Sequence, residues 1–303
     1  MVNTIFALDI GTRTVVGVLA RGSADRDLLE IIDMEVMEHS DRSMFDGQIH
    51  DIPKVTEVVR QVKTSLETRN NCRLQHVSVA AAGRALITHR VRVAESVEGR
   101  EPADTTFINS LELKAVQEAQ QQIQDTYKDN SQHYCVGYSV VDYYLDGVPI
   151  KSLEGHRGHE MGVEVIATFL PRSVVESLYA VMERSGLEVI NLTLEPIAAI
   201  TLAIPEKLRM LNLAMVDIGA GTSDIAISRN GSISAYAMVS MAGDEVTDEI
   251  AQHFLLDFQS AEGVKRKLFS GASSTVCRDV MGNQLTISRE ELCEIVRPVV
   301  ERI

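Results

Sequence analysis

The sequence predicts a mixed α/β fold made of two similar lobes, and three observations support this prediction. The same glycine turn occurs twice, first within Leu8–Thr12 (LDIGT) and again within Val216–Thr222 (VDIGAGT). Each copy lies between apolar stretches rich in β-branched residues, a pattern typical of a strand, a tight turn and a second strand. The chain has 303 residues, of which 45% are hydrophobic, and this is enough to form two cores.

The first copy is expected to begin a β-β-β-α-β unit. Residues 7–32 are expected to form strands joined by short turns. A helix opens at Pro53, because apolar side chains from Val55 to Leu66 recur at spacings of three and four residues, and it ends near Asn70–Asn71. Residues 76–82 then form a buried strand. This order places the helix on one face of the sheet.

A different kind of sequence follows and predicts an inserted subdomain at residues 86–170, here called the insert. It contains polar helical sequence around residues 111–123 and strand sequence near residues 136–145 and 163–169. No stretch rich in Pro, Gly or Ser marks its borders, which argues against a tethered module. The first lobe therefore comprises residues 1–85 and 171–203, in which Pro171 starts another helix.

The second lobe is expected to cover residues 204–303 and to be incomplete. After the second glycine turn, a helix is predicted to start at Gly243–Asp244, followed by a polar turn at residues 260–270. Ser288 and Glu291 form a capping box that begins the last helix.

Composition excludes several classes of protein. The net charge is −14, and no basic run is present, so we expect no nucleic-acid partner. The four cysteines show neither CxxC spacing nor the density of a disulfide scaffold, which indicates reduced thiols. No apolar stretch reaches the roughly 20 residues that a membrane-spanning helix needs. We therefore expect a cytoplasmic protein.

Both glycine turns carry groups suited to holding phosphate. Glycine lets backbone N–H groups approach an oxyanion closely, and threonine hydroxyls add donors. Asp9 and Asp217 stand at the same place in the two copies, and paired carboxylates can hold a divalent cation that neutralises phosphate charge. The chain has no GxxxxGK[ST] motif and no third glycine after the second turn, which excludes a P-loop and a dinucleotide fingerprint.

Three ordered motifs resemble those of the ATPase superfamily of actin, DnaK-type chaperones and sugar kinases. They are Asp9–Thr14 (DIGTRT), Glu195–Ala199 (EPIAA) and Asp217–Asp224 (DIGAGTSD). Within this superfamily the chain resembles FtsA-like proteins, because of the position of the insert, the segment Ala82–Arg84 that enters it and the return through Val181–Leu187. The resemblance implies two ribonuclease-H-like lobes around a nucleotide cleft, with an FtsA-type inserted subdomain in the first lobe.

The resemblance also implies ATP and Mg²⁺ as ligands. Asp9 and Asp217 would hold a hydrated Mg²⁺, and Glu195 would order the metal or the attacking water, with Asp217 as the second catalytic carboxylate. The alternative interpretation of Glu195 is that it only starts a helix. The residues implied to contact the nucleotide are Asp9, Gly11, Thr12, Arg13 and Thr14 in the first turn, Gly219, Gly221, Thr222 and Asp224 in or after the second, Gly243 beyond it, and the adenosine-contacting Glu262, Lys265 and Arg266.

The implied function is that of an FtsA-like ATP-binding protein with a weak Mg-dependent ATPase activity. Its nucleotide state would control self-assembly into filaments and the docking of a protein partner through the insert, in cell division or a related bacterial assembly such as a pilus. Two alternatives stay open: a DnaK-like chaperone or reactivating ATPase, and a small-molecule kinase on the same fold.

Two features of the resemblance are incomplete. The segment Glu262–Lys267 has a solvated charged turn as its alternative interpretation. The chain stops at Ile303, without the second adenosine motif of the family and without the amphipathic tail by which FtsA-like proteins reach a membrane. We therefore expect a C-terminally truncated chain, with membrane contact only through a tail absent from this sequence.

Overall fold

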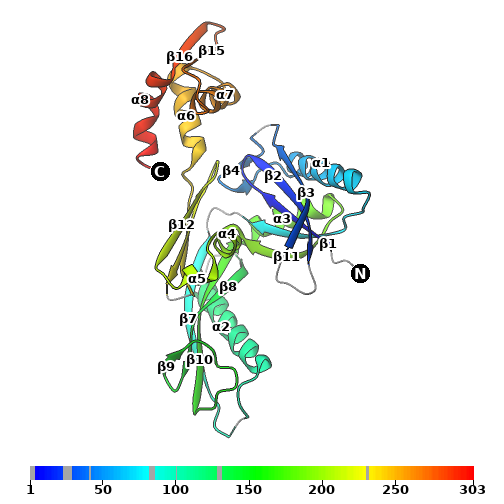
Figure 1. The fold of residues 1–303 in the computed structure, drawn as a ribbon, viewed down its shortest axis with the longest axis vertical. Coiled ribbons are helices and arrows are strands. Elements are labelled where there is room, and N and C mark those ends of the chain that lie inside the picture. The colour runs from blue at the N-terminus through cyan, green and yellow to red at the C-terminus, as the bar shows by residue number, and fades with distance from the viewer. Residues whose placement is uncertain are drawn as a thin grey trace. The chain divides into compact units, whose positions relative to one another are not determined.

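The computed structural model describes residues 4–22, 29–40, 42–81, 86–99, 101–127, 132–229 and 232–303 (Figure 1). The chain divides into two compact units. The first consists of Met1–Asp217 and Asp224–Met238, and the second of Ile218–Ser223 and Val239–Ile303. The segment Ala82–Arg84, on which part of the family resemblance depends, lies outside the described residues.

A five-stranded sheet in the order β11-β6-β1-β2-β3 forms the centre of the first unit. Strand β2 pairs antiparallel with both β1 and β3, β6 runs parallel to β1, and β11 runs parallel to β6. This is the predicted β-β-β-α-β unit, extended by one strand. The strands are β1 (Thr4–Ile10), β2 (Thr14–Gly22), β3 (Leu29–Glu38), β6 (His76–Ala81) and β11 (Glu188–Leu194).

Helix α1 (Ile52–Asn70) begins and ends where the sequence predicts. Asp51 caps it by accepting a hydrogen bond from the Lys54 N–H at 3.0 Å, and Asn71 ends it in the left-handed conformation. Close packing of α1 on the sheet requires a glycine, since a Cβ at Gly17 would lie 2.5 Å from the Val62 side chain. Helix α3 (Arg172–Arg184) shares the same buried core, as do β4 (Met44–Phe45) and β5 (Gln48–Ile49) in part.

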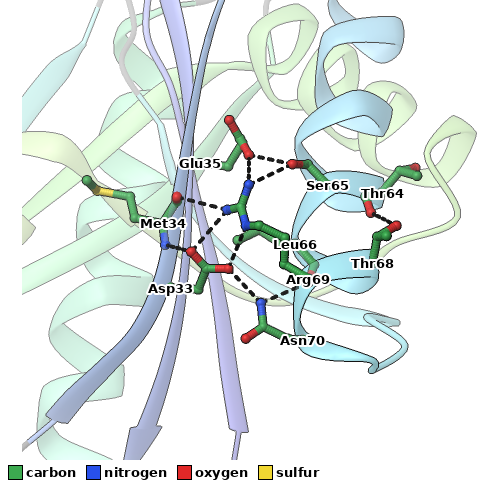
Figure 2. Close-up of polar contacts among 9 residues, drawn as sticks. All are labelled: Asp33, Met34, Glu35, Thr64, Ser65, Leu66, Thr68, Arg69 and Asn70. Atoms are coloured by element: carbon green, nitrogen blue, oxygen red, sulfur yellow. Dashed lines mark hydrogen bonds and ion pairs between the residues drawn. The ribbon is translucent and has the colours of Figure 1, made fainter.

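Polar side chains also join α1 to the edge strand β3 (Figure 2). The guanidinium of Arg69 forms ion pairs with Asp33 and with Glu35. Ser65 donates to Glu35 at 2.5 Å, and the Asn70 side chain donates to Asp33 at 2.7 Å. These bonds, led by the one from Arg69, lower the pKa of Asp33 to about 2. The last turns of the helix are therefore tied to the strand by charge as well as by apolar packing.

The insert folds around its own core. Its four strands stand in the order β7-β10-β8-β9, and α2 (Thr105–Thr126) packs on them through Leu111, Ala115 and Ala119. The helix and two of the strands were predicted. The long β7 was not, because its charged and polar positions outnumber its apolar ones. The strands are β7 (Ile87–Ser96), β8 (His133–Leu145), β9 (Val148–Ile150) and β10 (Glu160–Pro171).

The helix that begins at Glu195 and the three strands around the second glycine turn also lie in the first unit, apart from the strand ends next to that turn. Ile200 of the helix and Tyr236 of the strands are buried together with Ile166 of the insert, and the Tyr236 hydroxyl lies 2.9 Å from the Ser139 hydroxyl. The elements are α4 (Glu195–Ala203), α5 (Glu206–Arg209), and the three-stranded sheet β12 (Leu213–Ile218), β13 (Ser223–Arg229) and β14 (Ser232–Val239).

The second unit is built mainly from helices and corrects one prediction. The polar turn predicted at residues 260–270 is wrong, because most of this segment belongs to α7 (Phe258–Phe269). Asp257 caps α7 by accepting from the Ser260 N–H at 2.9 Å, and its buried side chains recur at helical spacing. The other elements are α6 (Gly243–Phe254), β15 (Ser274–Arg278), β16 (Gln284–Ser288) and α8 (Arg289–Val300), which begins at the predicted Ser288 cap.

No helix within the described ranges is both long enough and apolar enough to span a lipid bilayer.

Candidate functional site

The first turn, residues 9–14, connects β1 to β2. The Gly11 N–H donates to the Thr14 carbonyl at 2.9 Å and closes the turn. A Cβ at Gly11 would lie 3.3 Å from that carbonyl oxygen, so the turn leaves little room for a side chain. The Thr12 hydroxyl oxygen accepts a hydrogen bond from the Gly47 N–H at 3.0 Å, which ties the turn to the β4–β5 hairpin.

The second turn, residues 218–223, has the same closure. The Gly219 N–H donates to the Thr222 carbonyl at 2.9 Å, and a Cβ at Gly219 would lie 3.2 Å from that oxygen. Gly221 and Thr222 are buried within this turn. The repeat in the sequence therefore corresponds to the same closing backbone hydrogen bond in both turns.

The start of α6 is fastened to the second turn. The Gly243 N–H donates to the Gly219 carbonyl at 3.1 Å, and the Asp244 N–H donates to the Ala220 carbonyl at 2.7 Å. A Cβ at Gly243 would meet the Gly219 oxygen at 3.2 Å, so this close approach of two backbones favours glycine. Gly243, which was predicted to contact nucleotide, thus lies directly against the second turn.

The three residues predicted to contact adenosine lie next to Gly243 in the same unit. The Lys265 ammonium donates to the Gly243 carbonyl at 2.9 Å and to the Thr247 hydroxyl at 2.6 Å, and it pairs with Glu262 at 2.7 Å. Arg266 pairs with the other Glu262 oxygen at 2.8 Å. Partial burial raises the pKa of Glu262, but the bonds from Lys265, Thr247 and Arg266 outweigh it and hold the pKa at about 2.

In the first unit, three aspartates act on the carboxyl group of Glu195. Glu195 is the first residue of α4, and its carboxyl is hydrogen-bonded to Asp9 at the end of β1. Burial, the contact with Asp9, and the charges of Asp224 and Asp217 together raise the pKa of Glu195 far above its usual value. Asp217 lies in β12, and the buried Asp224 lies in β13. The structure therefore places Glu195 in contact with Asp9 and within electrostatic reach of Asp217 and Asp224.

The chemistry of these groups fits a hydrated divalent cation with phosphate. Mg²⁺ is typically held by one or two carboxylates plus water and phosphate oxygens, which is what Asp9 and Asp217 can offer. A closed protein cage is a different arrangement, and the described parts of the chain contain no group of three or more His, Cys, Asp or Glu side chains able to form one. The negative charges around Glu195 repel one another, and a bound cation would offset this repulsion.

Sequence reasoning missed His39, which follows β3. Its ring Nε2 lies 3.2 Å from the Gly11 carbonyl oxygen, and its backbone N–H donates to the Arg13 carbonyl at 2.9 Å. No motif surrounds this histidine in the sequence, and only the pairing of β3 with β2 brings it to the turn.

Comparison with known proteins gives a consistent result. The family model of the type IV pilus assembly protein PilM matches residues 7–276. The cell division protein FtsA of Pseudomonas aeruginosa is 26% identical over 97% of this chain and 70% of its own length. FtsA of Bacillus subtilis is 24% identical over 98% of this chain and 67% of its own length.

Solved structures show the same fold. The PilM–PilN type IV pilus biogenesis complex matches with a TM-score of 0.67 and 17% identity, covering 98% of this chain and 73% of that one. MreB5 of Spiroplasma citri bound to ADP matches with a TM-score of 0.50 and 15% identity, covering 99% and 76%. The chain therefore has an actin-like ATPase fold, and the predicted superfamily is confirmed, with FtsA as a distant homologue.

Proposed function

The chain belongs to the family of the type IV pilus assembly protein PilM, and we propose that it is an actin-like ATP-binding protein that acts in type IV pilus assembly. Its nucleotide state would control the docking of a partner protein and self-association. The observation that carries the proposal is the repeated turn, in which an aspartate precedes a glycine whose N–H closes the same backbone bond in both copies.

In this proposal the candidate residues contact different parts of Mg-ATP. Gly11, Thr12, Arg13 and Thr14 present backbone and side-chain donors to one part of the triphosphate, and Gly219, Gly221 and Thr222 present donors to another. Asp9 and Asp217 hold Mg²⁺, which neutralises phosphate charge when bound. Asp224 and the segment with Gly243, Glu262, Lys265 and Arg266 complete the nucleotide contacts, although the three Lys265 bonds described above must rearrange for its ammonium to bind a ribose hydroxyl.

Hydrolysis in this proposal is weak and depends on positioning. Glu195 would orient the attacking water or the metal-bound water, and the protein forms no covalent intermediate. The two lobes are proposed to comprise residues 1–85 with 171–203 and residues 204–303, and the insert at residues 86–170 is proposed to supply the partner surface. PilM is seen with PilN in the matching complex, so a PilN-like protein is the proposed partner.

A second candidate function is a role in cell division. It is favoured by the 26% identity to FtsA over 97% of the chain, whereas the family match favours the pilus. A small-molecule kinase stays as an alternative that phosphoryl transfer to a metabolite would support. A chaperone-like ATPase would instead be supported by stimulation of hydrolysis by unfolded polypeptide.

The proposal is tested by removing each aspartate charge without changing side-chain size. We expect Asp9→Asn and Asp217→Asn each to weaken Mg-ATP binding about 100-fold or more, because each loses a ligand to the cation that offsets phosphate charge. Titration calorimetry with Mg-ATP measures this. Asp125→Asn, an exposed change on α2, is the control and should bind as the parent does. Parent-like binding by both turn variants would contradict the proposed site.

A further inference from the structure

The side chain of His39, the residue that follows β3, contacts the first turn and lies outside both glycine motifs. The ring Nε2 contacts the Gly11 carbonyl at 3.2 Å across 28 positions of sequence. The backbone N–H of the same residue donates to the Arg13 carbonyl at 2.9 Å. One residue outside the motif therefore bonds two carbonyls of the turn.

In the second turn the corresponding glycine carbonyl is also hydrogen-bonded, but by a backbone donor and not by a side chain. The Gly219 carbonyl, which corresponds to that of Gly11, is bonded by the backbone N–H of Gly243 at 3.1 Å. In the first turn a side chain takes the place of this backbone donor. In each turn the glycine carbonyl therefore accepts a hydrogen bond, although the two donors come from unrelated parts of the chain.

Tying this carbonyl has a consequence for phosphate binding. The peptide group is planar and trans, so its C=O and the following N–H point in opposite directions. A bond that fixes the Gly11 carbonyl therefore also fixes the direction of the Thr12 N–H. Backbone N–H groups held in one direction are the donors by which a glycine turn binds an oxyanion.

We propose that His39 is a positioning residue for phosphate binding by the first turn, a role that rests on the proposed nucleotide site. Its Nε2–H holds the Gly11 carbonyl and thereby keeps the Thr12 N–H oriented for a phosphate oxygen. The role belongs to the side-chain donor, so a glutamine, whose amide can reach a similar point, should replace it, and an apolar residue should not.

The surroundings of the ring support the neutral form with the proton on Nε2. A carbonyl oxygen only accepts, so the nitrogen facing Gly11 must carry the hydrogen. Nδ1 is buried and has no hydrogen-bond partner among the described residues. Burial lowers the pKa of His39, and the bond to Gly11 offsets this only in part.

Two variants and a control test the proposal. We expect His39→Leu to weaken Mg-ATP binding about three- to tenfold, the effect of losing one net hydrogen bond, and to speed amide hydrogen exchange at Gly11, whose N–H closes the turn. His39→Gln should restore both values to within about twofold of the parent. His50→Leu removes an exposed imidazole from the neighbouring hairpin and should change neither.

The outcomes separate this role from the proposed function. Parent-like affinity and exchange in His39→Leu would overturn it, as would a glutamine variant no better than the leucine variant. If the parent does not bind Mg-ATP, the proposed function fails, and exchange at Gly11 still decides whether His39 orders the turn. Should His39→Leu not fold, nitrogen NMR of the parent ring decides, since a neutral ring with its proton on Nδ1 would leave Nε2 no hydrogen to donate to Gly11.

Discussion

The carboxyl group of Glu195 shows how strongly one residue's chemistry depends on its neighbours. The sequence left two interpretations open, a helix start and a group facing a phosphate site. In the structure Glu195 does start α4, with Pro196 in the first turn, and its carboxyl also contacts Asp9. Burial and three surrounding aspartates raise its pKa, a property that no local pattern in the sequence carries.

Replacing this carboxyl by an amide separates binding from hydrolysis. We expect Glu195→Gln to bind Mg-ATP within about threefold of the parent, because glutamine keeps the size and a hydrogen bond. We expect hydrolysis to slow about tenfold or more, because a bound cation would lower the raised pKa of Glu195 and restore a water-orienting carboxylate, which glutamine cannot form. Single-turnover phosphate release measures the rate. Glu183→Gln, exposed on α3, is the control. An unchanged rate in Glu195→Gln would remove this residue from the proposed mechanism.

At the scale of elements, α7 is where local sequence and tertiary packing disagree. Gly263 and the charged residues around it are typical of a turn, since glycine lowers helix stability by about 1 kcal/mol relative to alanine. The helix forms nonetheless, because Ala261, Val264 and Leu268 are buried in the core of the second unit. By contrast, α1 was predicted correctly because its caps and its apolar spacing agree with each other.

The helical state of Gly263 gives a direct prediction. Nothing lies within 4 Å of a Cβ built there, so Gly263→Ala should stabilise the protein by about 0.5–1 kcal/mol. Urea unfolding measures the change. Gly271, at φ +117°, is the matched comparison, and Gly271→Ala should destabilise because alanine rarely adopts that conformation. Destabilisation by Gly263→Ala would mean that the segment is a turn after all.

At the scale of the whole molecule, lowered carboxyl pKa values in both units link stability to pH. Asp33 in the first unit and Glu262 in the second both have a pKa of about 2, from usual values of 3.8 and 4.5. Between about pH 2 and pH 4.5 these two carboxyl groups therefore bind more protons in the unfolded chain than in the folded chain. The stabilisation from these groups is present above about pH 4.5 and is lost as the pH falls towards 2.

Removing Arg69, the ion-pair partner of Asp33, should make the free energy of unfolding less dependent on pH. We expect Arg69→Leu to unfold at lower urea concentration than the parent at pH 7, because two carboxylates lose their ion pair, and the difference to shrink on acidification. Urea midpoints at pH 7 and pH 3 measure both effects. Arg73→Leu, an exposed change just after α1, should follow the parent at each pH. A constant difference at both pH values would show that Arg69 acts through packing.

Local sequence patterns were enough to predict the two glycine turns, helix α1 with its caps and the α/β order of the first sheet. Turns, caps and amphipathic helices depend on residues close together in the chain, so glycine positions and apolar spacing are enough to predict them. Only the tertiary structure decided that Glu195 meets Asp9, that His39 holds the first turn and that α7 is a helix. The contacts of Glu195 and His39 join residues far apart in the sequence, which periodicity does not encode. In α7 the burial of one helix face outweighs the turn tendency of Gly263 and its charged neighbours.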